Sequence, residues 1–316
     1  MASVTVVIPL FNKAPHIERA LKSVFAQTVT PNEVIVVDDG STDGGGDLVK
    51  SFCNPHLRLI RQKNQGGGAA RNRGISEALG ELIAFLDADD AWKPRFLETV
   101  LSLQEKFPEA GAYGTAYELI SPQGEKQFPN SKIFQYVKLG LVDYLKGGFP
   151  VLPSASMVPK KVLKEIGGFT VGVYKGEDVD TWVRIALRYP IAWSSEYLAI
   201  WYHNAGNRAG NTAWRDEPPV SKTVRQLLHS GLVPSEKKQD LRDVAAYFQL
   251  AAAMDCLIGG KRRTASQLLD YARGTERHKW WWWKVRLASA IPGNAGPRMI
   301  WRIVQSLRGL AERLTR

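Results

Sequence analysis

The first part of the chain alternates between short apolar runs and segments with helical periodicity. Residues 4–10 are β-branched and almost continuously hydrophobic, as expected of a strand buried on both faces. Residues 14–26 place Ile17, Leu21 and Val24 on one helical face. The alternation continues with strand-like runs at 33–37, 57–60 and 82–86 and a helical segment at 69–79. Strands that alternate with helices predict an α/β domain on a mostly parallel sheet with right-handed crossovers.

The pattern changes after residue 108. A strand-like run at 111–120 precedes polar and mixed segments at 121–131 and 132–146, and helical segments at 160–166 and 178–189. From about residue 216 only helical patterns remain, at 220–229, 236–258, 262–273, 280–290 and 297–314. We therefore predict two parts: an α/β domain over residues 1–215 and an all-α region over residues 216–316.

Electric charge divides the chain in a similar way. The protein has 42 Lys or Arg and 31 Asp or Glu, a net charge of +11. Residues 261–316 hold 13 of these basic residues and three of the acidic ones, so this segment carries +10 of the total. The two parts are therefore expected to have different electrostatic roles.

Composition excludes several classes of protein. Hydrophobic residues make up 44% of the chain, which suits a sizeable core and not a disordered or collagen-like sequence. Cys53 and Cys256 are the only cysteines, which excludes a disulfide framework and a cysteine-based zinc site and fits a reducing compartment. No secretory signal is visible, and the apolar stretch at 244–258 is shorter than the roughly 20 residues of a membrane span. We expect a cytoplasmic protein that is not integral to a membrane.

Acidic residues follow two of the predicted strands. Asp38 and Asp39 come after the second strand, and three carboxylates lie between Asp87 and Asp90 after the fourth. Ligands bind at the carboxyl ends of strands in such sheets, although Asp is also common there in turns. Three carboxylates so close together repel one another unless a cation lies among them. Asp87 and Asp89 offer oxygen ligands for Mg²⁺ or Mn²⁺, with water and substrate phosphates completing the shell.

The glycines argue against two common nucleotide-binding classes. Glycine runs occur at 44–46 and 66–68, but neither forms a G-x-G-x-x-G turn after the first strand. A P-loop sequence is also absent. The first strand ends in Pro9-Leu10-Phe11-Asn12, which lacks the glycines of a pyrophosphate-binding turn. A hydride-transfer enzyme or a P-loop NTPase is therefore not expected.

Four motifs carry a family resemblance. They are VVIPLFN at 6–12, VVDDGSTD at 36–43, GAARNRG at 68–74 and FLDADD at 85–90, extended by GGF at 167–169 and EDVDTWVR at 177–184. In this order and spacing they resemble the family 2 glycosyltransferases with the GT-A fold, over roughly residues 3–205. The resemblance implies transfer of a sugar from a nucleotide-sugar, usually a UDP-sugar, with inversion at the anomeric carbon. It leaves the C-terminal third unexplained.

The resemblance also implies roles for residues of the donor site. Pro9 and Asp39 would line the nucleotide base pocket, with Asp39 accepting the uracil N–H, and Arg71 would belong to the same nucleotide site. Asp87 and Asp89 would take the metal role, with Asp89 as the more direct ligand. A divalent ion held in this way neutralises and orients a departing diphosphate. The expected cofactor is therefore Mn²⁺ or Mg²⁺.

Asp178 matches the catalytic base of the family's Glu-Asp motif. One-step inversion needs a carboxylate opposite the leaving group to take the proton of the acceptor hydroxyl. A carboxylate that opens a helix is also favoured as a plain cap, and Glu177 and Asp180 are the alternative bases. His203 would reach the metal or the diphosphate, as in some relatives, or simply pack beside its aromatic neighbours. Thr170 stands where relatives often have Asp, which leaves acceptor recognition open.

Four consecutive tryptophans at 280–283 lie in the basic C-terminal segment. Four in a row cover every face of a helix, so one buried stripe cannot absorb them all. Tryptophan together with Lys and Arg is typical of a membrane–water interface, which favours docking on an anionic membrane surface near a lipid-linked acceptor. Helix packing, an oligomer contact and nucleic-acid binding are the alternatives. Because no nucleic-acid-binding motif is present, no nucleic-acid partner is expected.

These observations predict a metal-dependent, inverting glycosyltransferase, peripheral at the inner face of the membrane, that acts in polysaccharide, lipopolysaccharide or related glycan synthesis. Its expected partners are a UDP-linked donor and a glycan or lipid-linked acceptor. A nucleotidyltransferase of similar α/β fold is one alternative, but the phosphate loop of that class is absent after the first strand. A non-catalytic basic protein that binds membrane or nucleic acid is the other, and the set of Asp87, Asp89 and Asp178 argues against it.

Overall fold

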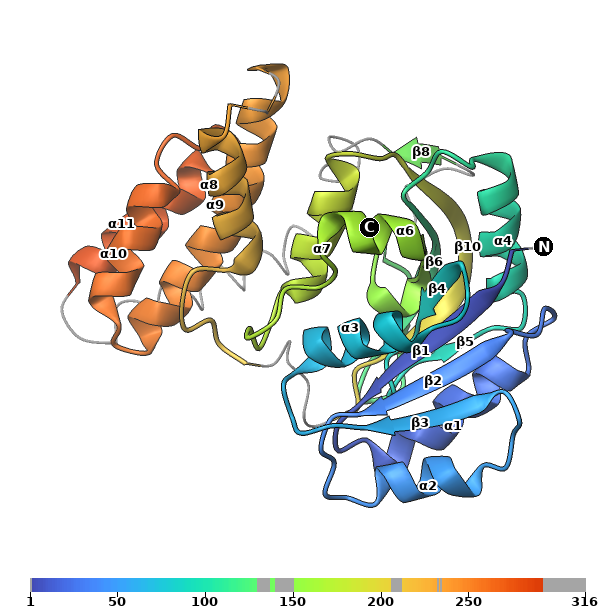
Figure 1. Ribbon diagram of the computed structural model, residues 1–316. Helices are drawn as coiled ribbons and strands as arrows, with labels where there is room; N and C mark the ends of the chain where they lie inside the picture. The colour runs from blue at the N-terminus through green and yellow to red at the C-terminus, as the bar shows by residue number, and fades with distance from the viewer. Residues whose placement is uncertain are drawn as a thin grey trace. The chain divides into compact units, whose positions relative to one another are not determined.

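The computed structural model describes residues 2–129, 137–139, 151–205, 212–231, 233 and 235–291, with the backbone alone at 137–139. The chain forms two compact units, Met1–Arg208 and Ala209–Arg316, and each is described by itself (Figure 1). The sequence pattern predicts a boundary a few residues later, near residue 215.

The first unit is built on one mixed sheet. Its parallel part consists of β3 (Leu57–Arg61), β2 (Glu33–Asp38), β1 (Val4–Leu10) and β4 (Leu82–Phe85), side by side in that order (Figure 1). These are the four strands that the apolar runs predict. β1, β2 and β4 are buried along nearly their whole length, whereas β3 at the edge of the sheet is half-exposed. The continuous hydrophobicity of the inner strands follows from helices that cover both faces.

One face of this sheet is covered by α1 (Ala14–Phe25) and α4 (Phe96–Lys106). Val6 and Ile8 of β1 point to this face and belong to the same buried cluster as the apolar side chains of both helices. Alternate residues of a strand point to opposite faces, so Val7 faces the other side. The other helices among the described residues of this unit are α2 (Gly45–Ser51), α3 (Gly67–Glu77), α6 (Lys160–Ile166) and α7 (Glu177–Ala186).

α3 packs on the opposite face, against Val7. A Cβ added to Gly74 would lie 2.4 Å from Val7 Cγ1, so only glycine allows α3 to approach the sheet this closely. The start of the helix is tied to the end of β2, because the Gly66 N–H donates to Asp39 Oδ2 at 2.8 Å. This packing brings the GAARNRG segment to the carboxyl ends of the strands.

β9 (Ser156–Pro159) and β10 (Ile191–Tyr202) are the two longest of the described strands that the sequence pattern does not predict. β9 lies between β4 and β6 (Ala112–Ile120) and runs antiparallel to both. β10 runs parallel to β6, with register shifts between Ser194 and Ala199 that break its apolar alternation. β9 has only four residues and contains a serine and a proline, so it lacks the unbroken apolar run that identifies β4. The short elements are β5 (Ala91–Trp92), β7 (Lys126–Gln127), β8 (Val137–Leu139) and the 3₁₀ turn η1 (Pro153–Ala155).

The described part of the second unit is helical, as predicted. Its helices are α8 (Pro219–His229), α9 (Ser235–Ile258), α10 (Arg262–Tyr271) and α11 (Lys279–Ala290). They share a buried cluster centred on residues such as Leu250, Leu268 and Val285. The helix expected at 297–314 lies outside the described residues. Among the helices that are described, each is too short or too polar to traverse a bilayer.

The tryptophan run of α11 divides between the inside and the outside of this unit. Trp281 and Trp282 pack against the buried cluster, and the Trp282 indole N–H donates to the Leu269 carbonyl at 2.9 Å. Trp280 and Trp283 are exposed by 82% and 57%. Helix packing therefore accounts for two of the four indoles and leaves two on the surface.

Candidate functional site

The turn directly after β4 carries the three carboxylates singled out in the sequence. A hydrogen bond from the Asp90 N–H to the Asp87 carbonyl closes the turn at 3.0 Å. Asp87 Oδ1 lies 2.6 Å from the Arg71 guanidinium, and Asp89 Oδ2 lies 2.6 Å from Lys13 Nζ. The repulsion expected among these acids is therefore offset by basic side chains from α3 and from the β1–α1 connection.

Asp90 fastens this acidic turn to the rest of the sheet. Its side chain is buried and accepts hydrogen bonds from the Ser154 hydroxyl at 2.5 Å and from the Tyr202 N–H at 3.1 Å. Burial raises the pKa of Asp90 well above its usual range, and the charges of Asp89 and Asp87 raise it further. Asp90 thus joins the end of β4 to η1 and to the end of β10, a structural role that the sequence pattern did not identify.

Arg71 connects the acidic turn to the start of α7. Its buried guanidinium donates to Asp87 Oδ1 at 2.6 Å and to Glu177 Oε1 at 2.9 Å, and its Cζ lies 5.3 Å from the centroid of the Phe169 ring. Burial by itself lowers the pKa of Arg71, but the two carboxylates outweigh it and raise the pKa above its ordinary value. The guanidinium is therefore a fixed positive charge between two of the predicted motifs.

Asp178 lies beside Glu177 in the first turn of α7 and is half-buried. The pKa of Asp178 is raised to about 6, mainly by burial and also by the Glu177 charge, while Arg71 acts to lower it. Asp178 Oδ1 accepts a hydrogen bond from the Val179 N–H at 2.8 Å. The residue that precedes the helix is Gly176, so no side chain caps α7 from that position. A carboxylate with this pKa can take up a proton near neutral pH.

The third acid of this helix has a different environment. Asp180 is 0% exposed, and its Oδ2 accepts hydrogen bonds from Thr170 Oγ1 at 2.6 Å and from Arg184 Nε at 2.9 Å. Arg184 also donates to the Ile166 carbonyl at 2.6 Å, so the cluster joins α7 to the end of α6. Asp180 is thus engaged in holding the Gly-Gly-Phe-Thr turn, which disfavours it as the alternative base and gives Thr170 a structural partner.

Asp39 holds the end of β2 to the loop before α3. Its carboxylate accepts hydrogen bonds from Gln62 Nε2 at 2.7 Å and from the backbone N–H groups of Gln65 and Gly66 at 3.0 and 2.8 Å. The residue is 2% exposed. Because a carboxylate has about four acceptor positions, roughly one remains for a ligand donor such as an imide N–H.

A small polar cavity of about 300 Å³ lies at the carboxyl end of β2. Asp38, Ser41 and Arg61 contribute to its lining, and Asp38 Oδ2 lies 3.5 Å from Arg61 Nε. Pro9 of β1 is in register with Val37, one residue before this end of β2. The structure therefore places Pro9 near the Asp38-Asp39 pair, at the carboxyl ends of the neighbouring strands β1 and β2.

The donor set for a divalent ion consists of two carboxylates. Within the described residues, no three His, Cys, Asp or Glu side chains gather closely enough to form a metal cluster. Mg²⁺ binds through one or two carboxylates and takes its other ligands from water and substrate phosphates, so Asp87 and Asp89 fit that mode. Each uses one oxygen for its basic partner, as described above. The His203 ring packs edge-on against Trp201, with centroids 4.2 Å apart.

Two basic residues at this site were missed in the sequence. Lys13 follows the VVIPLFN motif and pairs with Asp89. Arg19 donates from Nη2 to the Asp89 carbonyl oxygen and lies over the Tyr202 ring, 3.6 Å from its centroid. The helical spacing of residues 13 and 19 gives no sign that both reach the turn after β4, because that contact depends on how α1 packs. Together with Arg71 they surround the acidic turn with positive charge.

The sequence matches a known family over the region that contains this site. Residues 5–167 match the profile described as "Glycosyl transferase family 2". The chain therefore belongs to glycosyltransferase family 2.

Individual relatives agree with this assignment. An uncharacterized glycosyltransferase from Nostoc sp. is 40% identical over 37% of this chain and 36% of its own length. The uncharacterized glycosyltransferase YibD of Escherichia coli is 41% identical over 31% of this chain and 29% of its own. The match thus spans about a third of the length of these curated relatives.

A solved structure shares the fold. The crystal structure of S. aureus TarS 1-349 in complex with UDP-GlcNAc superposes with a TM-score of 0.68, at 17% identity, over 90% of this chain and 91% of that one. This likeness shows the GT-A fold predicted from the sequence, with a mixed sheet, flanking helices and a helical C-terminal region.

Proposed function

We propose that this glycosyltransferase moves a sugar from a UDP-sugar to a hydroxyl group of a glycan or lipid-linked acceptor, with inversion at the anomeric carbon. One observation carries the proposal: a single buried guanidinium, Arg71, contacts Asp87 after β4 and Glu177 beside Asp178. The acid turn proposed for the donor diphosphate and the helix proposed for the base are thereby held in one fixed arrangement. The complex of TarS with UDP-GlcNAc supports the choice of a UDP-sugar.

Asp178 is the proposed general base. With a pKa of about 6, its carboxylate is mostly ionised at neutral pH and still basic enough to accept the hydroxyl proton. As the acceptor oxygen bonds to the anomeric carbon, the carbon–oxygen bond to the diphosphate breaks and the proton moves to Asp178. Because Oδ1 is engaged by the Val179 N–H, Oδ2 is the oxygen we assign to the acceptor.

Residues at the carboxyl ends of the parallel strands and in α3 would bind the nucleotide. Asp39 accepts the base N–H next to Pro9, while Arg71 and Lys13 supply positive charge near the diphosphate. Mn²⁺ or Mg²⁺ bound by Asp89 and Asp87, with His203 as a further candidate ligand, would supply charge compensation for the leaving diphosphate. Lys13 neutralises Asp89 in the protein itself, so the carboxylate does not depend on an ion for its charge balance.

A screen of nucleotides for thermal stabilisation tests the proposal. UDP and UDP-sugars should raise the melting temperature more than GDP, ADP or their sugars, because a ligand that binds only the folded state stabilises it. The screen is run with Mn²⁺ and with a chelator to separate nucleotide binding from metal dependence. A protein that ignores every UDP compound under both conditions would contradict the proposed donor.

We also propose that the second unit docks on an anionic membrane surface at the cytoplasmic side, near a lipid-linked acceptor. Trp280, Trp283 and Leu287 follow one another on an exposed face of α11. Lys279 and Arg286 lie exposed on the same helix. Indole rings and basic side chains on one exposed helix suit the boundary between lipid headgroups and acyl chains.

A further inference from the structure

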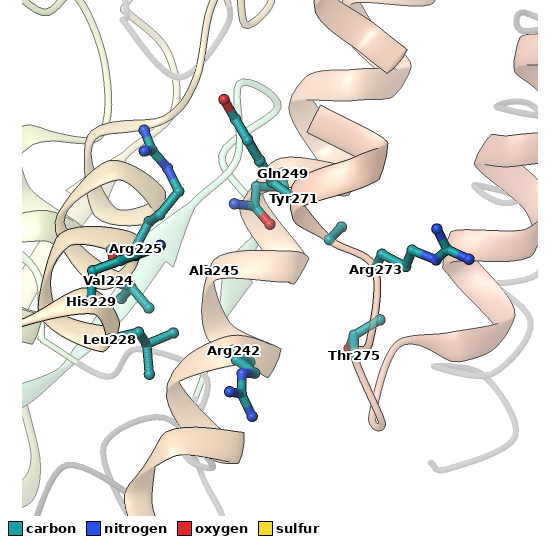
Figure 2. Close-up of a pocket in the computed structure, with 11 residues that line it drawn as sticks. Val224, Arg225, Leu228, His229, Arg242, Ala245, Gln249, Tyr271, Arg273 and Thr275 are labelled. Carbon is teal, nitrogen blue, oxygen red and sulfur yellow. The ribbon is translucent and has the colours of Figure 1, made fainter. Parts of the chain in front are cut away.

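A second cavity, of about 360 Å³, lies within the second unit, where α8, α9 and the end of α10 meet (Figure 2). This volume falls in the lower part of the range of small-molecule sites, about 300–1,000 Å³. Its walls combine small apolar groups, such as Val224 and Ala245, with a glutamine, a tyrosine, a histidine and arginines. The donor site described above does not use any of these residues.

Gln249 is a buried polar residue in the lining of this cavity. It is 3% exposed, and Figure 2 shows its amide directed from α9 into the space near Arg225 and Tyr271. Among the residues that the structure describes, the amide has no hydrogen-bond partner. The amide is not one of the fully enclosed polar atoms that lack a partner, so it faces the open space of the cavity and can bond to a molecule that enters it.

Arg225 and Tyr271 form a pre-arranged wall beside this amide. Arg225 Cζ lies 4.9 Å from the centroid of the Tyr271 ring. Glu217 holds the guanidinium in place, with Oε2 accepting from Nη2 at 2.8 Å and Oε1 accepting from Nε at 3.3 Å. This two-point contact fixes the plane of the guanidinium and leaves its Nη1 for another acceptor. The wall therefore offers an aromatic ring, a hydroxyl and N–H donors to a single ligand.

The rim of the cavity is positively charged. Arg242 and Arg273 contribute to the lining, and neither pairs with a carboxylate in the described residues, although Figure 2 shows both guanidinium groups directed outward. His229 adds a third basic group, with Nδ1 2.7 Å from the Arg225 carbonyl oxygen. Glu217 balances Arg225, and the described lining contains no acidic residue. The excess positive charge favours an anionic ligand.

We propose that this cavity binds an anionic sugar residue. A sugar ring combines apolar C–H faces, which fit Tyr271 and Val224, with hydroxyl groups that both donate and accept, as the Gln249 amide does. Its carboxylate or phosphate faces Arg225 and the basic rim. The assignment of this sugar to the acceptor glycan rests on the proposed glycosyl transfer; the binding site itself does not.

Binding of trigalacturonic acid to the full chain tests the site by calorimetry at low ionic strength. Maltotriose serves as the neutral match and inorganic phosphate as the simple anion. Trigalacturonic acid should bind measurably. Maltotriose, which lacks the carboxylates, and phosphate, which lacks the sugar rings, should each bind at least about 10-fold more weakly. Equal affinity for maltotriose would overturn the anionic assignment. Equal affinity for phosphate would show that the sugar ring is not recognised. If trigalacturonic acid does not bind, the whole proposal of an anionic sugar site is wrong.

Substitutions connect this binding to the cavity. Gln249→Leu should weaken the binding of trigalacturonic acid about 10-fold or more. It should not lower the melting temperature, because the amide makes no hydrogen bond within the described residues and leucine has a similar size. Gln267→Leu, at an exposed position of α10, is the matched control and should leave binding unchanged. Unchanged binding in Gln249→Leu, or loss of stability in that variant, would assign the glutamine to structure and overturn the site.

The charge of the rim is tested in the same way. The double variant Arg242→Gln, Arg273→Gln should weaken binding and its salt dependence, while Lys222→Gln, Arg263→Gln removes the same charge from exposed positions outside the cavity. If both double variants weaken binding equally, the attraction comes from the net charge of the protein, and the proposed role of Arg242 and Arg273 is wrong. UDP binding is measured in every variant. UDP binding without trigalacturonate binding disproves the cavity alone, and the reverse result disproves the proposed donor alone.

Discussion

Lys13 Nζ lies 2.6 Å from Asp89 Oδ2, and both side chains are only 12% exposed. The residue proposed as the more direct metal ligand is thus already paired with a lysine from the start of α1. A partly buried pair of this kind resists separation, because either charge alone would be left poorly solvated. A divalent ion must therefore share Asp89 with Lys13 or displace its amine toward the diphosphate.

Asp89→Asn tests this relationship. The variant keeps an oxygen acceptor near Lys13 but loses the charge that a divalent ion needs. UDP affinity, measured by calorimetry with Mn²⁺ and with a chelator, should lose its metal-dependent part while metal-free binding persists. Glu105→Gln, which removes one exposed charge from α4, is the control. If the variant keeps the metal-dependent UDP binding of the natural protein, Asp89 is not a metal ligand.

Asp178→Asn tests the base. The substitution preserves size and the hydrogen bond from the Val179 N–H but removes basicity, so the donor should still bind and transfer should fall about 10²- to 10⁴-fold. The rate of the natural enzyme should increase with pH through about 6, as Asp178 loses its proton. Initial rates and UDP-sugar affinity are measured in parallel. Near-normal transfer would mean that Asp178 is not the base and would favour Glu177 instead.

Asp178→Asn should lower the rate of transfer but raise the stability of the fold at neutral pH. The pKa of Asp178 is raised from 3.8 in the unfolded chain to about 6 in the fold, so the folded state holds the proton more tightly. Stability from this group is therefore lost as the pH rises from about 4 to about 6. Asp178→Asn should match the natural protein at acid pH and melt at a higher temperature above pH 6. A plain helix cap would show no such pH dependence, and equal melting curves at every pH would contradict the raised pKa.

Local patterns were sufficient to predict the strands that are buried along their length and the helices of the second unit. β1, β2 and β4 are continuous apolar runs because helices cover both faces, and that environment is visible in the sequence itself. β9 and β10 could not be predicted, because their environment leaves no such pattern in the local sequence. Their pairing with β4 and β6 is decided by tertiary contacts, and the register shifts of β10 disturb the alternation that would identify it.

The candidate site divides in the same way. Asp87, Asp178 and Arg71 belong to motifs and could be named before the structure. Their connection through one guanidinium could not, because Arg71 and Glu177 are separated by 106 residues along the chain. The environment of Asp180 was also out of reach, since its burial depends on Thr170 and Arg184 from the turn and helix around it. Motifs identify acids and bases, whereas packing decides which of them are engaged in structure.

Arg71→Met tests the bridge between the two halves of the site. The change leaves Asp87 and Glu177 without their buried cation, and removal of one partner from a buried ion pair typically costs about 3–5 kcal/mol. Chemical unfolding should show a loss of this order, together with weaker UDP binding. Adding Glu177→Gln should recover part of the stability, because the unpaired carboxylate disappears. A fully additive double variant would mean that the two side chains do not interact energetically.

The exposed face of α11 leads to the last prediction. Truncation after residue 260 is an ambiguous test, because Leu268 and Val285 belong to the buried cluster of the second unit and Trp282 packs against it, so their removal would expose the cluster. Trp280→Ser combined with Trp283→Ser changes only the two exposed indoles and should leave the melting temperature nearly unchanged. Leu79→Ser is the control, since Leu79 is equally exposed in the first unit.

Sedimentation with liposomes that contain anionic lipid then separates the two roles of α11. The natural protein should bind, and salt should weaken this binding without abolishing it, because each basic residue near the surface contributes about 1 kcal/mol while the indole contribution is apolar. The tryptophan variant should lose most of the salt-resistant part, and Leu79→Ser should keep it. If the natural protein stays in the supernatant at low salt, α11 does not dock on membranes, and helix packing is its whole role.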